Sequence, residues 1–200
     1  MDNVYFTHNH ATGTGATDGG GAIHATNTTC NISNSTFDDN YSAKDGGGMY
    51  VSDDINCNIT NSTFNGNTSD NDGGGMLVKG SNVTITGCTF SDNQAGAAGG
   101  GINGGGAGGL VIIINSTFSG NQANGGGGGA IHSLVENVNM NFTTVSGNTA
   151  TTNGGGVYLS TISELTIQNC MLGDNTATIG PDFSVDGGAT VTDDGHNIVE

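Results

Sequence analysis

The sequence contains no tryptophan and no arginine, and it has one proline and only two lysines, Lys44 and Lys79. Against these two basic side chains stand 18 aspartates and glutamates, which give a formal net charge of −16. So few positive charges cannot neutralise a phosphate backbone, which argues against nucleic acid as a partner. An anionic membrane surface would repel the chain for the same reason. The charge balance favours a cation as a ligand.

The chain also lacks an apolar run of membrane-spanning length, so we expect no membrane insertion. Its first residues, MDNVYF, have neither the basic start nor the apolar core of a signal peptide. If the protein is exported, the export signal is therefore not in this chain.

Glycine is abundant, with 38 residues, but a third of the chain is hydrophobic and these residues are regularly placed. The phrase apolar-x-x-Asn recurs at nearly equal intervals, of which the first is the longest. Its asparagines are Asn9, Asn40, Asn67, Asn93, Asn121, Asn148 and Asn175. A period in the twenties is typical of stacked repeat architectures.

Four positions in each repeat hold apolar or small residues: the apolar residue of the phrase, which we call the anchor, and three positions at fixed distances before it. The anchors are Phe37, Phe64, Phe90, Phe118, Val145 and Leu172. Five residues before them come Ile32, Ile59, Ile85, Ile113, Met140 and Ile167. Seven residues before them come Cys30, Cys57, Val83, Val111, Val138 and Leu165. Two residues before them come Ser35, Ser62, Cys88, Ser116, Thr143 and Cys170.

Positions two apart face the same side of a strand, so these columns predict inward ladders in a close-packed interior. The pattern predicts an all-β chain folded as a parallel β-helix, a β-solenoid of about seven coils of about 27 residues, in a single domain over 1–200. Each coil should hold two strands, or three, joined at bends. The asparagine column should stack by amide hydrogen bonds, and the glycine runs should supply turns with unusual dihedral angles.

Acidic residues stand immediately before three of the glycine runs, at equal intervals, and these are Asp18, Asp45 and Asp72. We expect these side chains to stack, and like charges ~4.8 Å apart repel one another by roughly 1–4 kcal/mol, depending on the local dielectric. A bound Ca²⁺ would remove this repulsion. The alternative is a solvated turn column whose side chains splay apart. Calcium is the one cofactor that the sequence suggests, and the calcium-binding nonapeptide of other solenoids is absent.

A threonine precedes most anchors and should point outward. The five are Thr36, Thr63, Thr89, Thr117 and Thr144. Regular outward threonines on a flat face suit an ice-binding or other surface-binding solenoid. Threonine is also simply a good strand residue, and the neighbouring outward columns are mixed. Ice binding is therefore an alternative hypothesis.

Cysteine and histidine form no clear metal or disulfide framework. Cys30 and Cys57 occupy one inward column in adjacent coils, so they form either a disulfide or two small apolar rungs. Cys88 and Cys170 lie three coils apart and cannot pair. The five histidines lack metal-ligand spacing, and we expect them at the surface or in turns.

A sugar-active β-helix enzyme is the third hypothesis. A hydrolase needs two carboxylates across a sugar. The candidates are Asp38, Asp39, Asp53, Asp54 and Asp92, which scatter among repeat positions with no long insertion to build a cleft. A lyase generally needs a basic group beside its acids, and the two lysines stand in different turns. The sequence favours a protein that is not an enzyme.

The pairing of F-x-x-N with a glycine run resembles the repeats of bacterial exported, adhesin-like right-handed parallel β-helix proteins, among them polymorphic outer-membrane protein passengers. It appears here as FDDN…GGGM, FNGN…GGGM, FSGN…GGGGGAI and VSGN…GGGV. The resemblance covers essentially the whole chain, and it implies a right-handed helix and an extracellular or bacterial cell-surface location. It also implies an adhesive or stalk-like role, with a glycan or another cell-surface molecule as a ligand.

The chain begins within a phrase, at Phe6 and Asn9, and stops at HNIVE with no amphipathic cap helix. Open parallel edges and cut ladders recruit further strands, and unlike ends that meet head to tail generate filaments. We therefore expect the chain either to continue into further coils or to self-associate end to end.

Overall fold

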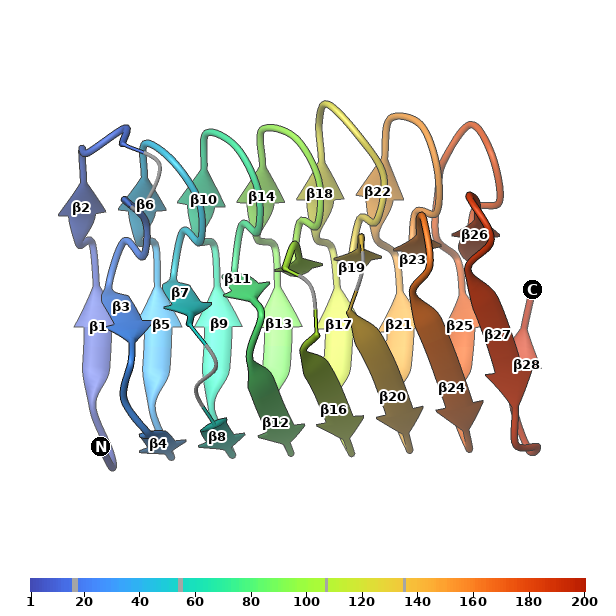
Figure 1. The fold of residues 1–200 in the computed structure, drawn as a ribbon, viewed down its shortest axis with the longest axis horizontal. Coiled ribbons are helices and arrows are strands. Elements are labelled where there is room, and N and C mark those ends of the chain that lie inside the picture. Colours follow the sequence, from blue (N-terminus) through green and yellow to red (C-terminus); the bar gives the residue numbers. More distant parts are fainter. Residues whose placement is uncertain (16–17, 54–55, 107, 135) are drawn as a thin grey trace.

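The computed structural model describes residues 1–15, 18–53, 56–106, 108–134 and 136–200. The regular elements over these residues are β-strands, and they wind into coils stacked along the long axis of the molecule (Figure 1). The two termini lie at opposite ends of the stack. No helix in this part of the chain is long and apolar enough to cross a membrane. The all-β parallel solenoid predicted from the repeat is confirmed.

A typical coil contributes one strand to each of four parallel sheets, numbered I to IV in the order in which the chain passes through them from residue 30 onward. Sheet I contains β4 (Cys30–Ser33), β8 (Asn56–Thr60), β12 (Asn82–Thr86), β16 (Leu110–Ile114), β20 (Asn137–Asn141), β24 (Glu164–Gln168) and β27 (Thr190–Asp193). Sheet II contains β1 (Tyr5–Thr7), β5 (Thr36–Asp38), β9 (Thr63–Asn65), β13 (Thr89–Ser91), β17 (Thr117–Ser119), β21 (Thr144–Ser146), β25 (Met171–Gly173) and β28 (Ile198–Val199).

The other two sheets complete the coil. Sheet III has two-residue strands, which are β2 (His10–Ala11), β6 (Tyr41–Ser42), β10 (Thr68–Ser69), β14 (Gln94–Ala95), β18 (Gln122–Ala123) and β22 (Thr149–Ala150). Sheet IV contains β3 (Ile23–Thr26), β7 (Met49–Ser52), β11 (Met76–Lys79), β15 (Ile102–Gly104), β19 (Ile131–Ser133), β23 (Val157–Leu159) and β26 (Phe183–Val185). The chain passes from sheet IV back to sheet I of the next coil.

The coil holds four strands, where the repeat predicts two or three, because the apolar run of each repeat is broken in its middle. Residues 57–64 do not form one strand but β8, a turn and β9. Asn61 in this turn has a φ of 47°, in the left-handed region that asparagine tolerates better than most residues. The turn explains why the inward spacing changes from two to three between Ile59 and Ser62.

The inward columns predicted from the repeat form the core, as their burial and register confirm. The rings of Phe37, Phe64, Phe90 and Phe118 are fully buried and nearly parallel, with centroids 4.3, 4.6 and 4.8 Å apart along the stack. Each fully buried side chain of this size stabilises the fold by about 1.5–3 kcal/mol. Because every rung lies between two others, the coils stabilise one another along the stack.

The asparagine column forms a continuous hydrogen-bonded ladder at the bend between sheets II and III. Asn93 shows the pattern. Its Nδ2 donates to the carbonyl oxygen of Phe64 and to Oδ1 of Asn121, each at 2.9 Å. Its Oδ1 accepts from the backbone N and from Nδ2 of Asn67, at 3.0 and 2.9 Å. The amide stacking expected from the sequence is confirmed, and each amide also holds the backbone of a neighbouring coil.

Acidic residues occupy the last position of two of the columns, in the last coil. These two ladders therefore end in a carboxylate that accepts hydrogen bonds. Nδ2 of Asn175 donates to Oδ1 of Asp182 at 2.8 Å, and this carboxylate takes the place of a further asparagine. Asp193 pairs with Ile167 and occupies the isoleucine column. Its carboxylate accepts hydrogen bonds from the backbone N of Gly195 and from Nδ2 of Asn197. The expectation that the ladders end unpaired is therefore wrong for the asparagine column at this end.

The glycine triplets satisfy three different constraints, of which the turn is only one. The first glycine, such as Gly73 with a φ of 66°, adopts a left-handed conformation. The second is pressed against the next coil, since a Cβ built on Gly74 would lie 2.5 Å from the carbonyl oxygen of Gly100. The third is also held close to the next coil, since a Cβ on Gly75 would lie 2.7 Å from the carbonyl oxygen of Gly101 and 3.1 Å from Cδ1 of Phe90. The alanine at this position, Ala130, stands where the following anchor is Val145 instead of phenylalanine.

We expect Gly74→Ala to lower the free energy of unfolding by about 2 kcal/mol, within the usual range for overpacking. Gly126→Ala should change it by less than about 1 kcal/mol, because a Cβ there would lie 3.3 Å from its nearest neighbours and alanine stiffens the unfolded chain. Urea denaturation of both variants measures the difference. Equal losses would show that the close approach at Gly74 does not limit side-chain size.

Candidate functional site

Sheet II presents the threonine column on its outer face. The threonines that pair in register are Thr36, Thr63, Thr89, Thr117 and Thr144. Thr117 is exposed and the other four are half-buried. Tyr5 and Met171 hold the same position at the two ends of the column. The coil repeat sets the spacing of this row at about 4.8 Å.

A second outward column lies two residues further along each strand of sheet II. Its members are Asp38, Asn65, Ser91, Ser119 and Ser146. Nδ2 of Asn65 donates to Oδ1 of Asp38 at 2.8 Å, and Oγ of Ser91 donates to Oδ1 of Asn65 at 2.8 Å. Sheet II therefore offers two parallel rows of polar groups, one of hydroxyls alone and one mixed.

Sheet I has a polar outer face interrupted by one apolar row. The outward side chains of β16 are Leu110, Ile112 and Ile114, each partly exposed. The strands on either side present Asn82, Thr84 and Thr86 on β12 and Asn137, Asn139 and Asn141 on β20. A shallow depression beside the row is lined by Ile112, Asn139, Thr166 and Asp194, among others. Apolar contacts and hydrogen-bonding groups thus lie side by side here.

Phe142 stands at the corner of sheet I directly after Asn141, the register partner of Ile114. Its side chain is 60% exposed and its φ is 50°. Other coils place residues suited to this backbone at the corner, namely Asn34, Asn61, Gly87, Asn115 and Asn169. A left-handed conformation costs a residue such as phenylalanine roughly 1–2 kcal/mol, and such strain is typical of functional positions. We call Leu110, Ile112, Ile114 and Phe142 the apolar patch.

The three aspartates proposed for calcium do not form one column. Asp45 and Asp72 stand level, because the N of Gly46 donates to the carbonyl oxygen of Asp72. Asp18 is one residue out of register, since Gly19 is the partner of Asp45. The reason is that the sequence separation between Ile23 and its register partner Met49 in sheet IV is one residue shorter than the separation between Asp18 and Asp45. The expectation that all three stack is therefore wrong.

The carboxylates of Asp45 and Asp72 accept hydrogen bonds from the next coil. Oδ1 of Asp45 accepts from Nδ2 of Asn71 at 2.7 Å, and Oδ1 of Asp72 accepts from the backbone N of Ala98 at 3.0 Å. Burial raises the pKa of Asp72. In the described ranges, no group of three or more His, Cys, Asp or Glu side chains is placed to hold a metal ion. Calcium binding here stays a prediction.

His132 belongs to a buried polar cluster that the sequence pattern does not reveal. It is 9% exposed, so the expectation that the histidines lie at the surface or in turns is wrong for it. Its Nδ1 lies 3.0 Å from Nδ2 of Asn103, and its Nε2 lies 3.2 Å from Oγ of Ser160. Burial lowers the pKa of His132 to about 4.

The orientation of this cluster does not suit nucleophilic catalysis. Because Asn103 donates to Nδ1, the imidazole proton lies on Nε2 and points at Ser160. A histidine in this tautomer has no free nitrogen on the serine side to accept the serine proton. The sequence signal of the cluster is that Asn103 and His132 hold the same position after successive glycine runs, and they are register partners in sheet IV.

Glu136 is fully buried at the corner between sheets IV and I. Its Oε1 accepts a hydrogen bond from the backbone N of Gly80 at 2.6 Å, and its Oε2 has no partner among the described residues. Glycine makes room for it, since a Cβ on Gly109 would lie 2.8 Å from its carboxyl carbon. Burial raises the pKa of Glu136 to about 7, against the opposing effect of backbone N–H groups.

Glu136 should make the stability of the fold depend on pH. The raised pKa means that the folded chain holds this proton up to about pH 7, whereas the unfolded chain releases it near 4.5. Its contribution is therefore fully present below pH 4.5 and is lost as the pH rises through 7, by about 3 kcal/mol in total. Urea denaturation should show that the free energy of unfolding falls less between pH 4.5 and 7 for Glu136→Gln than for the original chain.

The comparison between the two chains isolates Glu136 from other titrating groups. His132, whose pKa is lowered, contributes stability that is lost as the pH falls from about 6.5 to 4, which is the opposite sign. Both chains contain His132, so its effect cancels in the difference. Identical pH profiles for the two chains would contradict the raised pKa.

Three of the carboxylates considered for a hydrolase, those of Asp39, Asp53 and Asp92, serve as turn residues. Asp39 and Asp92 have φ of 51° and 53°, at a corner where other coils carry glycines such as Gly66 and Gly120. Asp53, with a φ of 67°, accepts a hydrogen bond from Oγ of Ser52 after β7. Asp38 points outward from β5, and Asp54 lies outside the described residues. Left-handed turns are where aspartate is tolerated, which explains the scatter of these residues.

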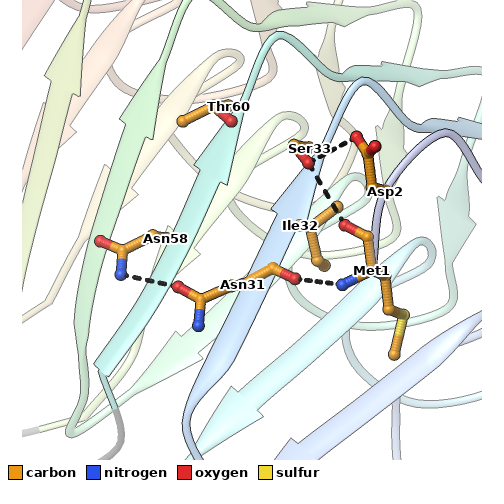
Figure 2. Close-up of a pocket in the computed structure, with 7 residues that line it drawn as sticks. All are labelled: Met1, Asp2, Asn31, Ile32, Ser33, Asn58 and Thr60. Atoms are coloured by element: carbon orange, nitrogen blue, oxygen red, sulfur yellow. Dashed lines mark hydrogen bonds between the residues drawn. The ribbon is translucent and has the colours of Figure 1, made fainter.

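A pocket opens at one end of sheet I, where the first residues run beside β4 (Figure 2). The ammonium of Met1 donates to the carbonyl oxygen of Asn31 at 2.7 Å, and Oγ of Ser33 donates to Oδ1 of Asp2 at 2.7 Å. Nδ2 of Asn58 donates to Oδ1 of Asn31 at 3.1 Å. These polar groups are engaged with one another, and Asp2 is the single carboxylate among the seven lining residues.

Comparison with known proteins gives two matches to family models. The model described as right handed beta helix region matches residues 20–200. The model of the Chlamydia polymorphic membrane protein repeat matches residues 3–26. No curated protein and no solved structure matches significantly.

Proposed function

The chain belongs to the right handed beta helix region family, and on this premise we propose that it is a rod-like, non-catalytic segment of a bacterial surface protein that binds a cell-surface ligand. The match of residues 3–26 to the polymorphic membrane protein repeat supports a surface role of the adhesin kind. The resemblance of the remaining repeats to the same kind of protein supports it further.

The single observation that carries the proposal is the apolar patch. A solenoid whose inward ladders run through the whole stack holds its outer faces rigid. On such a rigid face, the exposed Phe142 and the row at Ile112 and Ile114 interrupt columns that are otherwise polar. Aromatic and apolar side chains rimmed by amides and hydroxyls are suited to a ligand with both apolar and hydroxyl groups, such as a glycan.

Binding by beads coated with the chain tests this proposal. Beads should adhere to cultured epithelial cells, and soluble neutral oligosaccharides should compete. Phe142→Asn should reduce adhesion at least several-fold while leaving the fold intact, because asparagine suits the left-handed corner. Ile162→Asn is the matched control, since Ile162 is 73% exposed at the opposite corner of sheet I. Equal adhesion by both variants would reject the apolar patch as the binding site. No adhesion by the original chain or by either variant would reject the proposed function.

Ice binding is a second candidate, because the register aligns five threonines in one outward row. The neighbouring row of Asp38, Asn65 and serines is less regular, which favours the first proposal. Thermal hysteresis at micromolar concentration, abolished by Thr89→Tyr, would reverse this order. Release of reducing or unsaturated sugar ends from polysaccharides would favour an enzyme instead.

End-to-end association of this chain stays a prediction, with observations on both sides. Phe183, Val185 and Val199 hold core positions in the last coil but remain 37–39% exposed, which favours contact with another apolar surface. A stacked coil would also bury the carboxylate of Asp193, which opposes such contact. Light scattering over a range of protein concentrations measures whether the chains associate.

A further inference from the structure

We propose that Cys30 and Cys57 are a disulfide-forming pair that fastens β4 to β8 when the protein meets an oxidising thiol–disulfide environment. Both are thiols in this structure. Their positions in the register, their unequal access to solvent and the absence of a comparable partner for the other two cysteines carry this inference.

The register brings the two side chains together. Cys30 and Cys57 are direct partners on adjacent parallel strands and point into the same column. Partners on such strands lie about 4.8 Å apart, within the Cα range of roughly 4.4–6.8 Å found for disulfides. At the same spacing, their Cβ atoms must approach by about 0.3–1 Å to enter the disulfide range of roughly 3.5–4.5 Å. β8 pairs with β4 on one side, and the contacts of residues 1–3 on the other side fall on Asn31 and Ser33, so the Cys30 end of β4 is paired with β8 alone.

The two thiols differ in access. Cys30 is the first rung of its column, is 8% exposed and lines a depression of about 380 Å³ together with Ile23, Ala25 and Thr29. Cys57 is 1% exposed. A hydrogen bond with the Cys57 thiol lowers the pKa of Cys30, and the same interaction together with burial raises the pKa of Cys57. Cys30 is therefore the thiol that reacts first with a soluble disulfide.

The reaction balances with glutathione disulfide as oxidant. The Cys30 thiolate attacks one sulfur of glutathione disulfide, which forms a mixed disulfide and releases one glutathione. Cys57 then loses its proton and attacks Sγ of Cys30, which releases the second glutathione. The protein loses two hydrogen atoms, and one glutathione disulfide becomes two glutathione thiols.

The other two cysteines provide an internal control. Cys88 lies between two serines of its column, since the N of Ser62 donates to its Sγ and its own N donates to Oγ of Ser116. The N of Cys170 donates to Oδ1 of Asn197 in the following coil. Neither has a cysteine at the same column position in an adjacent coil, so both should remain thiols.

The test treats the folded chain with glutathione disulfide and then alkylates the remaining thiols after denaturation. We expect two alkylated residues, Cys88 and Cys170, and one peptide that links Cys30 to Cys57. The cross-link closes one full coil into a loop and should raise the Tm by about 5–10 °C, reversibly with dithiothreitol.

Cys57→Val is the matched variant, because valine fills the same column at Val83 and Val111. After the same treatment it should keep its Tm and carry either a free thiol or a glutathione adduct at Cys30. Four alkylated cysteines in the oxidised chain, a link that includes Cys88 or Cys170, or disulfide-linked dimers would each overturn the proposal.

Discussion

Replacing Ile85 with aspartate is expected to unfold the middle of the stack. Ile85 is fully buried on β12, between Ile59 and Ile113 of the neighbouring coils. A carboxylate at this position has apolar rungs above and below it and no partner, so the substitution should lower the free energy of unfolding by about 4 kcal/mol or more. Urea denaturation followed by circular dichroism measures the loss.

Two comparisons make this test specific to burial. Thr84→Asp places the same charge one residue away on the outer face of β12, and it should change stability by no more than about 0.5 kcal/mol. Lower pH should partly rescue Ile85→Asp, because burial raises the pKa of a carboxyl and the protonated form is cheaper to bury. A mild effect of Ile85→Asp at neutral pH would mean that the register of sheet I is wrong.

Replacing Asn93 with leucine is expected to cost about 3–5 kcal/mol, although the side chains have similar size. The change removes the acceptor for the backbone N and for Nδ2 of Asn67, which remain buried. Each buried donor left without a partner costs about 1–3 kcal/mol. The hydrogen bond from Nδ2 of Asn93 to the backbone carbonyl oxygen of Phe64 is also lost. Thermal and urea denaturation report the combined effect.

The control is an asparagine that also stacks on its neighbour but faces water. Nδ2 of Asn58 donates to Oδ1 of Asn31 on the outer face of sheet I, where both are exposed. Asn58→Leu should change stability by less than about 1 kcal/mol, because water replaces the lost hydrogen bond. Equal effects at Asn58 and Asn93 would show that amide stacking, and not burial of the amide, stabilises the coils.

The sequence by itself determined the fold, because each coil repeats the same inward residues. The spacing of Phe37, Phe64 and Phe90 set the coil length, and two-residue alternation on a strand set which side chains point inward. The asparagine column was predictable for the same reason, since identical residues at a fixed period meet their own kind in a parallel stack. The threonine row followed from its fixed place beside each anchor.

The corners between the sheets differ in length from coil to coil. Which side chains come into contact at these corners was decided only by the tertiary structure. A step in sheet IV that is one residue shorter than the interval between the aspartates moved Asp18 out of line with Asp45. The corners between sheets IV and I buried Glu136 against Gly80, 56 residues earlier in the chain. Ser160, just after the end of β23, meets His132, which is not its equivalent position in the neighbouring coil. A period fixes contacts between equivalent positions, whereas contacts at irregular corners depend on how each loop packs against the coils beside it.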